Sequence, residues 1–199
     1  KSTIHDAEWM RAQGWAPALR QYAQNAGGRV VGLCGGYQIL GRTLVDDEAR
    51  ESTLTHARGM GLLDVETAIG EMKIVRTSTG RDRLFNSPVH GYEIHQGRTA
   101  RGPDAKPFLD LECGPDGALN AARTVWGTYL HGLFDSADFR NAFLGALASR
   151  RNIAFMPTHH HALHGPTSRD AQYDALADHF EKHMNVVALI DAMDNDSPS

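Results

Sequence analysis

The fold is decided by the stretch Arg29-Val30-Val31-Gly32-Leu33-Cys34-Gly35-Gly36-Tyr37-Gln38-Ile39-Leu40. Its first half is a short apolar run, which is typical of a strand buried on both faces of a sheet. Cys34 ends this run, and Tyr37–Leu40 can begin a helix directly afterwards. A helical segment also precedes the strand, and helices alternating with buried strands indicate an α/β fold. We therefore predict an α/β domain with Cys34 on the turn between a buried strand and a helix.

The turn itself predicts a nucleophile. Residues 32–36 follow the pattern glycine, any residue, nucleophile, any residue, glycine. Glycines suit such a turn because its backbone is strained and its neighbours must lack Cβ atoms to pass closely. The N–H group of Gly35 is expected to face the space above the sulfur, where an oxyanion would form. The alternative is a buried structural cysteine, the usual fate of a free thiol in an apolar strand.

Outward from this motif the chain alternates between helical and strand-like segments. We predict helices from Ser2 or Thr3 to near Gly14, over about Pro17–Asn25, from Asp135 or Ser136 to about Arg150, and over about Thr167–Met184. Strands are expected at Leu62–Thr67, Lys73–Thr77, Tyr92–Arg98, Phe108–Cys113 and Val125–Leu130. The tail Asp191–Ser199 is expected to fray. A length of 199 residues with no internal repeat or linker predicts a single domain over residues 1–199.

A thiol nucleophile needs a proton carrier, and His131 is the best candidate among the 11 histidines. It follows the predicted strand Val125–Leu130 directly, so it should lie at the carboxyl end of that strand. Open parallel sheets place their active sites along this edge. The alternative is an ordinary histidine in a surface loop.

Other polar residues carry weaker signals. Glu93 and His95 alternate along a predicted strand, so they share one face, which could line a pocket or be an exposed polar face. Cys113 lies outside any such turn and is predicted to be inert. The cluster His159, His160, His161 and His164 within the loop Met156–Pro166 matches no recognised metal-ligand spacing, so we predict no metal site.

Composition excludes several classes of function. Twenty Lys and Arg against 24 Asp and Glu give a net charge of −4, which does not favour binding to nucleic acid or to an anionic membrane surface. The apolar runs are far shorter than the roughly 20 residues that a membrane span needs, and no signal peptide opens the chain. Two cysteines make no disulfide framework. We therefore expect a soluble cytoplasmic protein.

Three motifs resemble the glutaminase domain of the cobyric acid synthase family, which belongs to the class I, triad-type glutamine amidotransferases. They are Cys34-Gly35-Gly36-Tyr37-Gln38, Gly91-Tyr92-Glu93-Ile94-His95-Gln96-Gly97-Arg98-Thr99 and Gly127-Thr128-Tyr129-Leu130-His131-Gly132-Leu133-Phe134. The resemblance extends over nearly the whole chain. It implies an open, mostly parallel, flavodoxin-like sheet with flanking helices.

The resemblance also implies roles for individual residues. Cys34 would attack the side-chain amide of glutamine, and His131 would be the general base. Gly35 matches an oxyanion donor, and Gln38 stands where related glutaminases contact glutamine. The strand from Tyr92 through Glu93 to His95 resembles a wall of the pocket. Ammonia would pass to an ATP-dependent synthetase domain that amidates carboxylates of adenosylcobyrinic acid a,c-diamide.

Two departures from the family pattern stand out. Many class I glutaminases have a Glu two residues after the catalytic His, whereas this chain has Leu133. The resemblance is therefore to a Cys–His dyad, with no third member assigned, although a carboxylate such as Glu93 could approach in space. The chain also begins after the strands expected upstream, so we expect an N-terminally incomplete glutaminase domain without cofactor. ATP and Mg²⁺ are expected only for the separate synthetase domain.

Other readings stay open. Within the family these are cobyrinate a,c-diamide synthase and the glutaminase subunit that amidates lipid II. From another class, cysteine-dependent stress proteins and proteases use the same strand-to-helix turn, but they would not hydrolyse glutamine. A domain that binds a partner without catalysis is the last alternative. Replacing Cys34 by alanine would separate it from the enzymes, because partner binding should survive.

Overall fold

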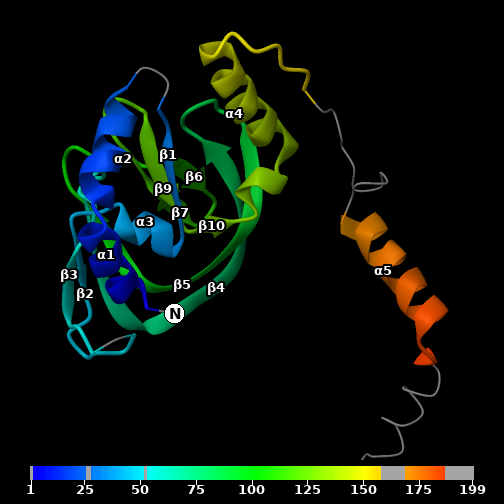
Figure 1. Ribbon diagram of the computed structural model, residues 1–199, viewed down its shortest axis with the longest axis horizontal. Helices are drawn as coiled ribbons and strands as arrows, with labels where there is room; N and C mark the ends of the chain where they lie inside the picture. The colour runs from blue at the N-terminus through cyan, green and yellow to red at the C-terminus, as the bar shows by residue number, and fades with distance from the viewer. Residues whose placement is uncertain (1, 26–27, 52, 158–168, 187–199) are drawn as a thin grey trace, which may run out of the picture. The chain divides into compact units, whose positions relative to one another are not determined.

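In the computed structural model, the apolar run before Cys34 forms β1 (Val30–Leu33), which pairs in parallel with β9 (Val125–Thr128). The short β8 (Ala118–Leu119) pairs antiparallel with the other edge of β9, giving the order β1-β9-β8. The helix predicted after the cysteine is α3 (Gly35–Ile39). The α/β class with flanking helices is thus confirmed (Figure 1).

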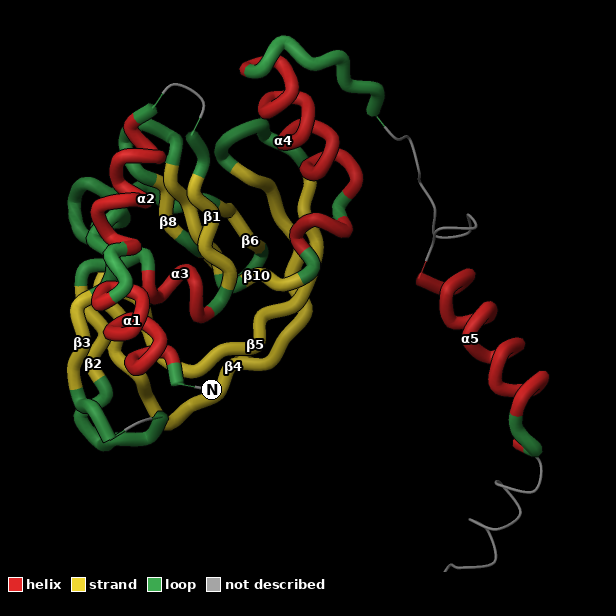
Figure 2. The backbone as a smooth tube through the Cα atoms, viewed as in Figure 1, coloured by secondary structure: helices red, strands yellow, loops and turns green. Residues whose placement is uncertain are grey.

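A second sheet is built on one long hairpin, β4 (Val65–Asp82) and β5 (Pro88–Arg101). The carboxylate of Asp82 fixes its turn by accepting hydrogen bonds from the N–H groups of Leu84, Phe85 and Ser87. The sequence predicted two separate strands, Leu62–Thr67 and Lys73–Thr77, but β4 runs through both and shifts register between Ala68 and Lys73. The two strands of the hairpin run side by side and curve along one side of the first unit (Figure 2).

This sheet corrects the prediction of a mostly parallel arrangement. Its order is β10-β5-β4-β2-β3, with β6 paired to β4 and β7 paired to β6. The remaining strands are β2 (Thr43–Val45), β3 (His56–Arg58), β6 (Leu109–Leu111), β7 (Gly114–Asp116) and β10 (Leu130–His131). Among the described strand pairs only β1 with β9 and β2 with β4 are parallel. Strands joined by a tight turn can pair only antiparallel, and the β4–β5 hairpin makes such pairing dominant.

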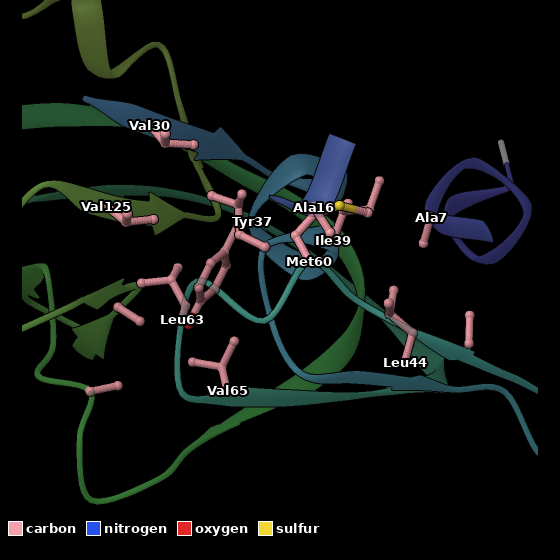
Figure 3. Packing of buried hydrophobic residues seen from close by; sticks show 14 of the residues in the cluster. Ala7, Ala16, Val30, Tyr37, Ile39, Leu44, Met60, Leu63, Val65 and Val125 are labelled. Carbon is pink, nitrogen blue, oxygen red and sulfur yellow. The ribbon is translucent and has the colours of Figure 1, made fainter. Parts of the chain in front are cut away.

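Two helices pack over the first hydrophobic cluster. They are α1 (Thr3–Ala12) and α2 (Trp15–Gln24), separated by Gly14 at φ +80° as the sequence predicted. Ser2 stands at the N-cap of α1, but its side chain makes no capping hydrogen bond. The cluster beneath contains Tyr37, Leu44 and Met60, each at most 1% exposed (Figure 3). It holds α3, and therefore the turn before it, against the sheet.

A second cluster anchors the segment after His131. The 3₁₀ turn η1 (Leu133–Asp135) leads into α4 (Ala137–Arg150), as predicted. Phe139 of α4 is fully buried and lies edge-on to Trp126 of β9 and to Phe108. Burying such a ring contributes roughly 1.5–3 kcal/mol. This packing fixes the chain on the C-terminal side of His131.

The structure describes residues 2–25, 28–51, 53–157 and 169–186. The chain divides into two units, Lys1–Pro157 and Thr158–Ser199, and the second contains α5 (Arg169–His183) where a helix was predicted. We predicted one amidotransferase domain over residues 1–199, and the inclusion of the second unit in that domain stays a prediction. In the part of the chain described, no helix is both long and apolar enough to cross a membrane.

Candidate active site

Cys34 lies on a strained turn between β1 and α3. Its backbone has φ +53° and ψ −112°, in the region that L-residues rarely adopt. Its N–H group donates to the carbonyl of Thr128, 2.9 Å away, which ties the turn to the end of β9. A Cβ on Gly32 would lie 2.7 Å from the backbone of Gly36, so a glycine is required at position 32. A Cβ on Gly36 would meet nothing within 4 Å. The strand-to-helix turn that the sequence predicted is present.

The thiol of Cys34 is directed to the β4–β5 hairpin. Cys34 is 8% exposed, and its Sγ lies 3.7 Å from the carbonyl oxygen of Ile94 on β5. This contact joins the turn after β1 to the middle of the second sheet. The candidate nucleophile thus lies where the two sheets meet.

His131 reaches the same stretch of β5. It ends β10, in register with Tyr92, and its ring stacks on that tyrosine with the centroids 5.2 Å apart and the planes 10° from parallel. Tyr92 and Ile94 are two residues apart on one strand, a separation of about 7 Å. Because β1 and β9 are parallel neighbours, the segments that follow them carry both predicted catalytic residues to this edge.

One nitrogen of His131 has no partner. Its Nε2 is buried and makes no hydrogen bond within the described part of the chain. A buried polar atom left unpaired costs about 1–3 kcal/mol, and such groups concentrate at functional sites. The unpaired nitrogen makes His131 a candidate functional residue.

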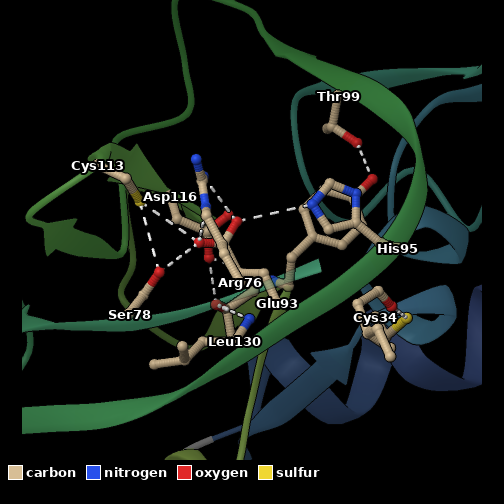
Figure 4. Close-up of polar contacts among 12 residues, drawn as sticks. Cys34, Arg76, Ser78, Glu93, His95, Thr99, Cys113, Asp116 and Leu130 are labelled. Atoms are coloured by element: carbon tan, nitrogen blue, oxygen red, sulfur yellow. Dashed lines mark hydrogen bonds and ion pairs between the residues drawn. The ribbon is translucent and has the colours of Figure 1, made fainter. Parts of the chain in front are cut away.

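Glu93 and His95 lie on the other face of β5, and both are buried. Arg76 of β4 binds the carboxylate of Glu93 with two hydrogen bonds, Nε to Oε1 at 2.8 Å and Nη2 to Oε2 at 3.0 Å. Ser78 Oγ donates to Oε1 at 2.8 Å, and Cys113 Sγ lies 3.4 Å from the same oxygen (Figure 4). The carboxylate of Glu93 is thus directed to this cluster and not to His131.

Two opposing effects act on the pKa of Glu93. Burial raises it, but the hydrogen bonds from Arg76, Ser78 and Cys113 together outweigh burial and lower the pKa below its ordinary value. Glu93 is therefore ionised at neutral pH, which makes it suited to hold Arg76 in place.

His95 is stacked on Tyr129, with ring centroids 3.6 Å apart and planes 11° from parallel. Its Nε2 lies 3.7 Å from Glu93 Oε2, and its Nδ1 is buried without a hydrogen bond in the described residues. Burial lowers the pKa of His95 and outweighs the nearby carboxylates of Glu93 and Asp116. The imidazole is therefore neutral at pH 7.

Gln38 is fully buried beside this cluster. Its Nε2 donates to the carbonyl of Gln96 and to the hydroxyl of Tyr129, each at 3.0 Å. The same hydroxyl lies 2.5 Å from Thr99 Oγ1, and burial raises the pKa of Tyr129 to about 12. The side chain of Gln38 thus ties α3 to β5, and its contact with glutamine stays a prediction.

A cavity of about 350 Å³ opens on this face of β5. Glu93 and His95 line it, together with the charged side chains Arg76, Arg98, Arg101 and Asp116. Burial raises the pKa of Asp116, although its carboxylate accepts a hydrogen bond from Thr128. Cys34, His131 and Tyr92 are not among the residues that line this cavity. Along β5, the side chains of Glu93 and His95 therefore lie on one face and that of Tyr92 on the other, whereas Cys34 and Gln38 both contact backbone carbonyls of the strand.

Four residues of this network are not predicted from the sequence as site residues: Arg76, Ser78, Asp116 and Tyr129. Counting residues outward from the β4–β5 turn could have found the first two, because Arg81 pairs with Pro88 and the same register places Arg76 opposite Glu93. Asp116 and Tyr129 carry no comparable local signal. The described residues contain no group of three His, Cys, Asp or Glu side chains that could hold a metal ion, and His159–His164 lie outside them.

Comparison with known proteins defines the class. A solved structure described as a glutamine amidotransferase matches with a TM-score of 0.52 at 14% identity, covering 75% of this chain and 76% of the other, which shows a shared fold. Residues 1–139 match the family described as the CobB/CobQ-like glutamine amidotransferase domain. The chain belongs to this family.

Curated relatives support the assignment. Cobyric acid synthase of Cereibacter sphaeroides is 43% identical over 192 residues, which cover 96% of this chain and 37% of the relative. Cobyric acid synthase of Synechocystis sp. is 36% identical over 206 residues, covering 100% of this chain and 40% of the relative. The chain therefore spans about two-fifths of the length of these relatives.

Proposed function

We propose that the chain hydrolyses glutamine to glutamate and ammonia, with Cys34 as the nucleophile and His131 as the general base. The observation that carries the proposal is the position of Cys34 on a strained turn close to His131. Cys34 contacts Ile94 of β5, and His131 pairs with Tyr92, two residues earlier on the same strand. Strained backbone at a buried, potentially nucleophilic side chain is typical of catalytic turns. Membership of a glutamine amidotransferase family gives the nucleophile its substrate class.

The reaction follows from these two side chains. His131 takes the proton of the Cys34 thiol as the sulfur attacks the side-chain carbonyl carbon of glutamine. The resulting oxyanion accepts a hydrogen bond from the N–H group of Gly35, the first residue of α3. The carbon–nitrogen bond then breaks, and the leaving nitrogen takes the proton from His131 and departs as ammonia. Water, activated by His131, hydrolyses the thioester and releases glutamate.

The position of the rest of the glutamine molecule is not part of the proposal. The cavity beside Glu93 and His95 carries arginines that suit a carboxylate, but Cys34 and His131 are not among the residues that line it. Substrate roles for Gln38, Tyr92, Glu93 and His95 stay predictions.

We also propose that the ammonia serves a cobyric acid synthase reaction, in which an ATP- and Mg²⁺-dependent synthetase domain amidates a corrinoid substrate. The support is the identity to cobyric acid synthases over almost the whole chain. The rival amidations, of cobyrinate or of lipid II, would use the same glutaminase chemistry. A coupled assay of the chain together with a synthetase domain, ATP, Mg²⁺ and each acceptor in turn would separate them, because only the true acceptor raises glutamine hydrolysis.

A pair of cysteine variants tests the glutaminase activity. Cys34→Ala should lower the rate of glutamate release by at least about 10³-fold, since removal of a catalytic nucleophile commonly costs more than this. Cys113→Ala is the control for the loss of a thiol elsewhere and should cost far less than Cys34→Ala, although it removes a contact with Glu93. Equal rates for Cys34→Ala and the unsubstituted protein would refute the proposal.

A further inference from the structure

Catalytic histidines in triads are oriented by a third group, commonly a carboxylate that fixes the tilt of the ring. Here the position two residues after His131 holds Leu133, which is 1% exposed and packs in the aromatic core. The nearby carboxylate of Glu93 is occupied by Arg76 and Ser78 on the opposite face of β5. Neither of these two positions supplies a carboxylate that orients the imidazole.

The ring of Tyr92 supplies one. It lies nearly parallel to the imidazole of His131, with a centroid separation of 5.2 Å and an interplanar angle of 10°. Stacking restricts rotation of both rings, and such pairs contribute roughly 0.5–1.5 kcal/mol beyond their buried area. An aromatic face also attracts the imidazolium that forms when His131 takes a proton.

The backbone holds this stack in register. Tyr92 and His131 are paired residues of β5 and β10, and a Cβ on the preceding Gly91 would lie 2.0 Å from the carbonyl oxygen of His131. Only glycine allows the two strands to approach so closely. Gly132, at φ +75°, turns the chain immediately after His131. The ring of Tyr92 thus faces an imidazole whose backbone is fixed on both sides.

We propose that Tyr92 is a positioning residue that orients His131 by stacking on the face of its ring, a role that a hydrogen-bonding carboxylate has in triads. This inference rests on the proposed glutaminase function and reassigns Tyr92 from the wall of the substrate pocket. Its action depends on the aromatic ring and not on the hydroxyl group. Because it sets the geometry of proton transfer, it contributes to kcat and leaves the binding of glutamine nearly unchanged.

Three variants of the full chain test the proposal by steady-state glutamine hydrolysis. Tyr92→Leu should lower kcat by about 10- to 100-fold with KM within about twofold, since a catalytic group displaced by 1 Å can cost about 10²-fold. Tyr92→Phe keeps the ring and should restore kcat to within about twofold. Tyr22→Leu on α2 is the matched control, because Tyr22 is exposed to the same degree, 45% against 44%, and should keep full activity.

Nuclear magnetic resonance tests the stack without turnover. In protein labelled at histidine, the ring protons of His131, assigned with the His131→Gln variant, should show an upfield ring-current shift. The shift should persist in Tyr92→Phe and disappear in Tyr92→Leu.

A raised KM with unchanged kcat in the kinetic measurements of Tyr92→Phe would instead assign the hydroxyl to substrate binding and overturn the inference.

The two proposals fail in different ways. An unsubstituted chain that releases no glutamate overturns the proposed function, and with it the catalytic part of this inference, while the ring-current shift still reports the stack. An active unsubstituted chain whose Tyr92→Leu variant keeps its kcat overturns the inference alone.

Discussion

The two faces of β5 differ although they are built from consecutive residues. Tyr92 and Ile94 are 44% and 37% exposed, and the ring of Tyr92 stacks on that of His131. Glu93 and His95 are 2% and 6% exposed, and they belong to a network of charges and hydrogen bonds. The alternation of side chains along a strand produces this separation.

The comparison indicates a division of labour. On the face of Glu93, hydrogen bonds from Arg76 and Ser78 satisfy the carboxylate and tie β4 to β5. On the face of Tyr92, His131 keeps a buried nitrogen that makes no hydrogen bond within the described part of the chain. Fully paired polar groups make a region rigid, whereas an unpaired one is left for a ligand or a reaction. His95 Nδ1 on the Glu93 face is also buried without a hydrogen bond in the described residues, so an unpaired polar atom does not by itself distinguish the two faces. We propose the chemistry for His131, on the Tyr92 face, and structural work for the Arg76–Glu93 pair.

The largest effect on stability is expected at Gly91, where β5 and β10 approach each other closely beside Tyr92 and His131. Gly91→Ala places a Cβ 2.0 Å from the His131 carbonyl oxygen and 3.1 Å from Leu130 Cγ, so the strands must separate. We expect a loss of about 3 kcal/mol in the free energy of unfolding, at the upper end for overpacking. Glutamine hydrolysis should also fall, because His131 moves.

Urea unfolding measures this loss. Gly70→Ala on β4 is the matched control, because a Cβ there meets nothing within 4 Å, and it should change the free energy of unfolding by less than about 1 kcal/mol. Equal stability of the two variants would contradict the close approach of the strands.

The next effect concerns the paired face. Glu93→Gln keeps the shape of the side chain but removes the charge that Arg76 binds, and we expect a loss of about 1–2 kcal/mol because Arg76 is half-exposed and regains water. Asp110→Asn is the matched control: its carboxylate also binds an arginine, Arg83, with two hydrogen bonds, but both groups are exposed. That variant should lose no more than about 0.5 kcal/mol.

Chemical denaturation of both variants gives the comparison. A loss for Glu93→Gln no larger than that for Asp110→Asn would show that burial adds nothing to the Arg76–Glu93 pair. A large fall in kcat with unchanged stability in Glu93→Gln would show that Glu93 takes part in the reaction, and would contradict its assignment to structural work.

The smallest effect is a dependence of stability on pH. Burial lowers the pKa of His95, so the unfolded chain binds a proton at this residue more readily than the folded chain. The contribution of neutral His95 to stability is therefore complete above the pKa of His95 in the unfolded chain, about 6.5, and is lost as the pH falls below that value. Glu93, whose pKa is also lowered, loses its contribution in a separate and more acidic range.

Unfolding curves between pH 7.5 and 5 test the prediction for His95. In the unsubstituted protein the free energy of unfolding should decrease as the pH is lowered from 7.5 to 5. The variant His95→Phe, which keeps a ring against Tyr129, should show a smaller decrease. An unchanged slope in His95→Phe would show that His95 is not the group responsible.

The chemical face was largely predictable from the sequence. The apolar run before Cys34 and the glycines beside it are local signals, and the position of His131 followed from the strand before it. The family resemblance added the roles of both residues. The strand and the turn were predicted correctly because a buried parallel strand and the turn after it are encoded within about ten residues, while the roles of the two residues stay predictions.

The paired face was not predictable in the same way. The contact between Arg76 and Glu93 depends on the register of two long strands, and the sequence analysis had divided β4 into two separate strands. Asp116 and Tyr129 meet His95 and Gln38 only through pairing of segments distant in sequence. The parallel character of the sheet was overestimated for the same reason, since long-range pairing decides it.

The central claim is that Cys34 is the nucleophile of a glutaminase. Labelling with a diazoketone analogue of glutamine, followed by peptide mapping, tests it most directly. Accessibility alone favours Cys113, which is exposed, over Cys34, which is buried. The account predicts a single adduct on Cys34 that excess glutamine prevents, with no adduct on Cys113. Labelling of Cys113 alone, or labelling of Cys34 that glutamine does not reduce, would contradict it.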